Sequence, residues 1–217
     1  MNEHFPDVPS RPGATPAPHL TPGFARALEA RAPLTMKDSL EVVRQYAWFE
    51  RSLFEIVGAW VVSVEEPAIR VCLHVSSRRH VLHAELWEDL FGGLGWVAGD
   101  PVIPLTDSVV VDFMQHFRLP DQDGTLERVV GLYRVVLPRL ISTYSLHLEH
   151  SAQVADAAVL RVLKLVLLED HEEWHQGEMM LQSLLATEAD VLAASRRQSE
   201  LEVLAQRCGL GASAWPG

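Results

Sequence analysis

Four long stretches of this sequence repeat apolar residues every three or four positions, and this spacing constrains the fold more than any other feature. Residues with that spacing lie on one face of an α-helix, so each stretch predicts a helix with a buried face. The first begins after Thr35, the second at Pro67 and the third at Thr125. The fourth is apolar on nearly all sides from Val154 to Leu168, which predicts a fully buried helix that continues to about Ala186. The chain therefore predicts an all-α fold.

The segments between these helices predict two helical hairpins joined by a crossover. Glu65-Glu66-Pro67 is typical of a tight turn, with proline at a first helical position. A second turn is expected between His150 and Asp156. Residues 92 to 124 are rich in glycine and proline, with one short helix expected from Ser108 to Phe117, which suits a crossover between hairpins.

Three regions follow from this pattern. Residues 1–34 predict a proline-rich flexible tail with a short docking helix, because they offer little surface that could pack into a core. Residues 35–186 predict the helical bundle, and residues 187–217 a C-terminal helix and tail.

Charge and cysteine usage narrow the function classes. The 217 residues include 18 basic and 29 acidic side chains, and the net charge of −11 opposes both phosphate backbones and anionic lipid surfaces. We therefore expect neither nucleic acid nor membrane as a partner. Cys72 and Cys208 are the only cysteines and cannot form a disulfide framework, and the N-terminus lacks a signal-peptide pattern. We expect a cytoplasmic protein.

Polar residues interrupt the apolar faces of the first two helices. Glu50 falls inside the first stripe, and His80 and His83 fall inside the second. Glu50 and His80 are equally distant in sequence from the turn at residue 65, so an antiparallel hairpin brings them to the same height. Because a buried acid or imidazole needs a partner, these interruptions predict a site inside the bundle.

The fourth helix carries a dense group of metal-ligand side chains from Glu169 to Glu178. Within it, Glu172 and His175 have i, i+3 spacing, which places two side chains on one helix face about 5–6 Å apart. We predict that Glu172 and His175 join Glu50, His80 and His83 around one ion. Any one of these residues alone would more often be satisfied by a hydrogen-bonded core neighbour, but the convergence of all five favours metal binding.

This arrangement resembles the ferritin-like superfamily of di-iron carboxylate proteins over residues 35–186. That family places one glutamate on each of two helices and Glu-x-x-His on each of the other two. Glu50 matches the first glutamate, His80-x-x-His83 stands where the first Glu-x-x-His belongs, and Glu172-x-x-His175 matches the second. The resemblance implies a ferritin-like four-helix bundle with extra N- and C-terminal helices.

The third helix departs from the family pattern. It has no carboxylate between Glu127 and Glu149, and Tyr133 or Tyr144 faces inward instead. Glu50 and Glu172 then supply only two negative charges, which favours one divalent ion over two, although a tyrosinate from Tyr133 would permit a second ion.

The resemblance implies two classes of function. One is a non-haem metal oxidoreductase that uses O2 on a small organic substrate, with iron as the expected ion, although zinc, manganese and copper also accept such ligands. The alternative is a ferritin-like scaffold or binding protein without redox chemistry, which could form a homodimer through the C-terminal helix expected within residues 187–217.

Overall fold

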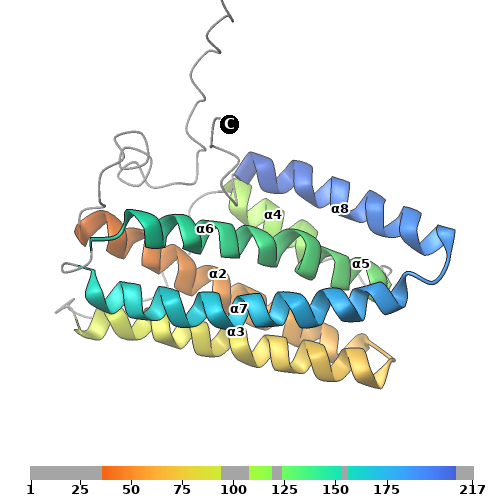
Figure 1. The fold of residues 1–217 in the computed structure, drawn as a ribbon. Coiled ribbons are helices and arrows are strands. Elements are labelled where there is room, and N and C mark those ends of the chain that lie inside the picture. The colour runs from red at the N-terminus through yellow and green to blue at the C-terminus, as the bar shows by residue number, and fades with distance from the viewer. Residues whose placement is uncertain (1–35, 94–107, 119–123, 153–155, 209–217) are drawn as a thin grey trace, which may run out of the picture.

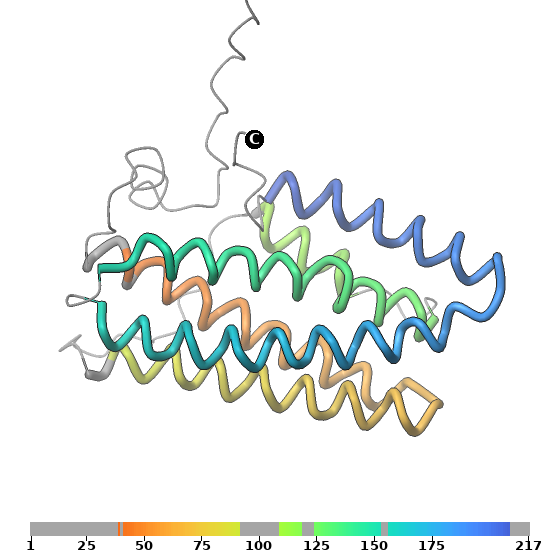
Figure 2. The backbone as a smooth tube through the Cα atoms, in the orientation of Figure 1, coloured from red at the N-terminus to blue at the C-terminus, as the bar shows by residue number. Residues whose placement is uncertain are grey.

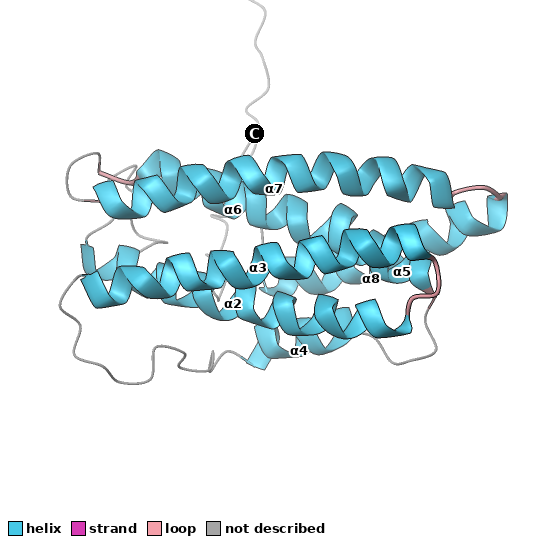
Figure 3. Cartoon of the chain, turned by 90° about the horizontal axis from the view of Figure 1, so that it is seen from below, coloured by secondary structure: helices cyan, strands magenta, loops and turns pink. Residues whose placement is uncertain are grey.

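The computed structural model describes residues 36–93, 108–118, 124–152 and 156–208. Within these ranges the chain is helical and contains no strand, which confirms the all-α class (Figures 1 and 3). The N-terminal tail and docking helix expected for residues 1–34 lie outside the described residues, as does the end of the C-terminal tail. None of the helices in the described ranges combines the length and apolar character of a membrane span.

The first hairpin consists of α2 (Met36–Ser63) and α3 (Pro67–Gly93). The chain reverses where the sequence predicts a turn, and Arg70 stabilises this reversal by donating to the carbonyl of Val64 at 2.7 Å. The two helices approach closely at Gly58, where an added Cβ would lie 3.0 Å from the hydroxyl of Ser77. The register between α2 and α3 is therefore set by a short connection and by close packing.

The third long helix is one run of three parts, α5 (Thr125–Val130), η1 (Gly131–Val136) and α6 (Leu137–His150). The sequence predicts a bend near Pro138, and the structure places the wider π-helical segment η1 just before it. Proline has no amide hydrogen and its ring crowds the carbonyl four residues back, which disfavours a regular α-helical turn there. The amide of Leu137 donates instead to the carbonyl of Leu132, five residues back.

The second hairpin is completed by α7 (Ala157–Leu184), which packs against α6 and also against α3 (Figure 2). Two shorter helices cover one side of these four. α4 (Ser108–Arg118) contacts α2, and α8 (Glu188–Cys208) packs on α4 and α5 (Figure 1). The core lies between the two hairpins, where long helices face one another.

The prediction that the fourth helix is buried on all sides is wrong. Leu165 and Leu168 on α7 are 40% and 69% exposed, whereas Leu163 and Val166 are fully buried. α7 has an outer face because its neighbours α3, α5, η1 and α6 leave Leu165 and Leu168 uncovered. The apolar run in the sequence therefore does not reveal which side of α7 faces the core.

Candidate metal centre

Several buried polar side chains surround Glu50 on α2. Its side chain is fully buried. One carboxylate oxygen accepts a hydrogen bond from His80 Nδ1 at 2.6 Å, and the other accepts one from the Tyr144 hydroxyl, also at 2.6 Å. His83 Nδ1 lies 3.6 Å from that second oxygen. The sequence prediction that Glu50 and His80 meet at one height is confirmed.

α7 contributes two buried acids to the same group. Asp170 Oδ1 lies 3.6 Å from His83 Nδ1, and Glu173 Oε1 lies 3.9 Å from His80 Nε2. Glu173 also accepts hydrogen bonds from the Ser76 hydroxyl and from Arg79, the latter at 3.0 Å. We call the set Glu50, His80, His83, Asp170 and Glu173 the buried cluster.

Several polar atoms of the buried cluster have no hydrogen-bond partner among the described residues. They are both carboxylate oxygens of Asp170, Nε2 of His80 and Nδ1 of His83. Buried polar atoms without partners are costly. All four of these atoms belong to ligand types that bind metals, so they indicate an interaction with a cation. Ligand atoms of Glu50, His80 and His83 lie within 4.8 Å of one another, close to the roughly 4 Å between ligands of one ion.

Burial and neighbouring charges shift the pKa values of the side chains in the buried cluster. Burial alone would raise the pKa of Glu50, but the charge and hydrogen bond of His80, followed by those of His83, lower that pKa to about 2. Burial disfavours protonation of His83, yet Glu50, Asp170 and Glu169 raise its pKa to about 9. Burial and the charge of Glu50 hold the pKa of Asp170 well above its usual range. Without a cation, the cluster must therefore retain protons that a bound cation would replace.

Aromatic residues close the cluster on the side of Glu50. The ring of Tyr144 lies 4.7 Å from that of Tyr46 and 5.7 Å from that of Trp87, measured between centroids. All three side chains are buried. Burial and the adjacent Glu50 carboxylate raise the pKa of Tyr144 well above its ordinary value, so Tyr144 remains a neutral phenol that donates to Glu50.

The inward placement expected for Glu172 and His175 is wrong, because both side chains lie on the exposed face of α7. The buried face of this part of α7 instead follows a series with spacings of three and four: Asp170, Glu173, Gly177 and Leu181.

Gly177 explains this rotation of α7. A Cβ at position 177 would lie 2.1 Å from the ring of Tyr133, so only glycine allows η1 to approach α7 at this point. Tyr133 itself lies beside Ser76, and burial raises its pKa above the ordinary value. The neutral phenol is therefore favoured, which counts against the tyrosinate ligand that the sequence allowed.

Sequence reasoning missed Asp170, Glu173 and Tyr144 as members of the site. The series from Val166 through Asp170 and Glu173 to Gly177 shows that the two acids share one helix face, but the sequence does not show that this face is buried. The sequence predicts that Tyr133 or Tyr144 faces inward, and in the structure the hydroxyl of Tyr144 donates a hydrogen bond to Glu50.

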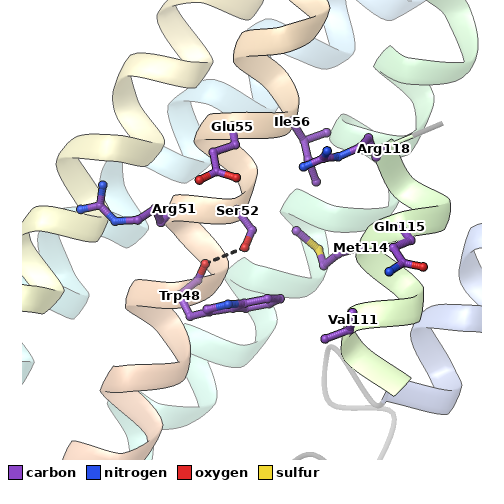
Figure 4. Close-up of a pocket in the computed structure, with 9 residues that line it drawn as sticks. All are labelled: Trp48, Arg51, Ser52, Glu55, Ile56, Val111, Met114, Gln115 and Arg118. Carbon is purple, nitrogen blue, oxygen red and sulfur yellow. Dashed lines mark hydrogen bonds between the residues drawn. The ribbon is translucent and has the colours of Figure 1, made fainter. Parts of the chain in front are cut away.

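Two surface hollows lie near these helices. The larger, about 420 Å³, is formed by α2 and α4 and contains no residue of the buried cluster (Figure 4). We call it the α2–α4 hollow, and its lining includes Trp48, Glu55, Met114 and Arg118. The other, about 340 Å³, lies between α3 and α7 and is called the α3–α7 hollow; its lining consists of His74, Val75, Arg78, Arg79, Leu82, Glu169 and Glu172.

Comparison with known proteins finds no matching family model, no matching curated protein and no matching solved structure.

Proposed function

We propose that this chain is a ferritin-like, non-haem metal-binding oxidoreductase that holds one divalent ion, iron, at the buried cluster. The observation that carries the proposal is that unpartnered atoms of His83 and Asp170 meet beside Glu50: His83 Nδ1 lies 3.6 Å from a Glu50 oxygen and 3.6 Å from an Asp170 oxygen. Two helical hairpins with ligand-type residues on their facing sides support the ferritin-like arrangement.

The charges of the buried cluster support one ion. Arg79 neutralises Glu173 through their ion pair, which leaves Glu50 and Asp170 to balance a divalent cation. Asp170 thereby takes the part that the sequence assigned to Glu172. Two imidazoles and two carboxylates form a ligand set that suits iron(II), manganese and zinc.

The residues of this chain would divide the work at such a centre. Glu50, His80, His83 and Asp170 would hold the ion, and iron bound there would supply one-electron chemistry with O2 for a small organic substrate. Tyr144 fixes the orientation of Glu50 through its hydrogen bond, and Ser76 and Arg79 do the same for Glu173. Tyr46 and Trp87 exclude water from the side of Glu50.

A ferritin-like scaffold without redox chemistry is the second candidate, and one observation favours it. Glu50, His80 and His83 are each 0% exposed, so an organic substrate has no direct contact with them in this conformation. A homodimer through α8 stays a prediction.

Metal content tests the proposal directly. Protein purified without chelator and without a metal-affinity resin should carry about one ion per chain, measured by mass spectrometry. His83→Gln should lose the ion, whereas the matched control His74→Gln, an exposed histidine on the same helix, should keep it. Wild-type protein that binds no ion after dialysis against Fe²⁺, Mn²⁺ or Zn²⁺ would overturn the metal centre.

Oxygen uptake then separates the two candidates. Iron-loaded protein supplied with ascorbate should consume O2 faster than the same protein loaded with zinc. Stoichiometric iron with no uptake above the zinc form would instead support the scaffold.

A further inference from the structure

The α3–α7 hollow is connected to the buried cluster by two direct contacts. Glu169 lines the hollow, and its carboxylate accepts a hydrogen bond from His83 Nε2 at 2.8 Å. Arg79 also lines the hollow and donates to Glu173 at 3.0 Å. By contrast, neither Glu169 nor Arg79 lines the α2–α4 hollow.

Glu169 spans the distance between solvent and cluster. Its side chain is 36% exposed, whereas His83, its partner, is fully buried. The two nitrogens of His83 therefore face opposite ways: Nε2 faces Glu169 at the surface, and Nδ1 faces Glu50 and Asp170 inside. A cation that displaced this hydrogen bond would first bind the surface carboxylate of Glu169. It would then have to move only one side-chain length to reach the buried ligands.

We propose that the α3–α7 hollow is the port through which a divalent cation enters and leaves the buried cluster, with Glu172 attracting the ion and Glu169 transferring it inward. This inference rests on the proposed metal centre. It gives a role to Glu172, which faces the hollow rather than the core.

The charges around the hollow determine how the port responds to substitution. Glu169 and Glu172 offer carboxylate oxygens, which suit a partly hydrated divalent ion. Arg79 is neutralised by Glu173, but Arg78 is exposed and makes no ion pair with any described residue. Glu172 should therefore speed the arrival of a cation, and Arg78 should slow it.

The test measures the rate at which the chelator-treated full chain takes up Co²⁺, followed by its visible absorption in a stopped-flow instrument at about 0.01 M salt, where surface charges are weakly screened. Glu172→Gln should slow uptake about two- to fivefold, and Arg78→Gln should accelerate it by a similar factor. Leu82→Trp adds bulk to the hollow without changing charge and should also slow uptake. Glu55→Gln is the matched control, because it removes the same charge from the α2–α4 hollow.

Equilibrium affinity separates a port residue from a ligand. A residue on the route changes entry and exit by about the same factor, so the Co²⁺ dissociation constant of each variant should stay within about twofold of wild type. Uptake rates of Glu172→Gln, Arg78→Gln and Leu82→Trp that all match the Glu55→Gln control would overturn the port while leaving the metal centre intact. Failure of wild-type protein to bind Co²⁺ at all would overturn the metal centre and the port together.

Discussion

Asp170→Asn should stabilise the metal-free protein more than the metal-loaded protein. In the metal-free chain, Asp170 is fully buried and both its carboxylate oxygens lack partners among the described residues. Its pKa is held well above the usual range by burial and by Glu50. The substitution keeps the shape of the side chain and removes its ionisable group.

The magnitude follows from proton linkage. A carboxyl with a raised folded pKa loses about 1.4 kcal/mol of stability for each pH unit between its unfolded pKa, about 3.9, and its folded pKa, so the loss at pH 7 is bounded at about 4 kcal/mol. Because its folded pKa is raised, the stability that Asp170 contributes is complete below about pH 3.9 and is lost as the pH rises. We expect Asp170→Asn to stabilise the metal-free protein by about 1–3 kcal/mol at pH 7, since the new amide must also find partners, and by much less at pH 4.

With the ion bound, this gain should be offset or reversed, because the variant has also lost a metal ligand. Loss of a ligand should weaken metal binding at least about 10–100-fold, which removes about 1.4–2.7 kcal/mol of the stabilisation that the ion provides.

Urea unfolding of wild type and variant, each with chelator and with Co²⁺, measures both effects. Glu172→Ala is the control, because this exposed residue should change stability by less than about 0.5 kcal/mol in either condition. If Asp170→Asn destabilised the protein equally with chelator and with metal, the carboxyl would be a structural hydrogen-bonding group and the reasoning would be refuted.

Three further substitutions test the packing and electrostatics around the cluster. Gly177→Ala should lower the free energy of unfolding by about 1–3 kcal/mol, because its Cβ would lie 2.1 Å from the Tyr133 ring; a more stable variant in thermal melts would contradict this close contact. Tyr144→Phe should cost the chelator-treated protein about 1–3 kcal/mol, since it removes a hydrogen bond to the buried carboxylate of Glu50, and an unchanged urea midpoint would show that this bond contributes nothing. Burial, with a smaller effect of His150, lowers the pKa of His147 to about 4, so the stability that its neutral form contributes is present above about pH 6.5 and declines by about 3 kcal/mol as the pH falls to about 4. His147→Gln should abolish that part of the acid dependence in urea titrations, and parallel curves for wild type and variant would count against it.

Much of the first hairpin could be predicted from the sequence because its determinants are local. Proline at position 67 and a short connection set the turn, and the turn sets the register of α2 against α3. Residues equally distant from a tight turn must lie at the same height, so Glu50 and His80 could be paired without a structure, and they hydrogen-bond at 2.6 Å.

The face that α7 turns to the core was decided only by tertiary structure. An i, i+3 pair such as Glu172 and His175 shows that two side chains share a helix face, but it does not show which face is buried. The apolar run before it offered no preference, because it has apolar residues on nearly every side. Packing resolved this ambiguity: the ring of Tyr133 needs the space that Gly177 leaves, and seating it there turns Asp170 and Glu173 inward and Glu172 and His175 outward. That contact joins residues far apart in the chain, so no local pattern could reveal it.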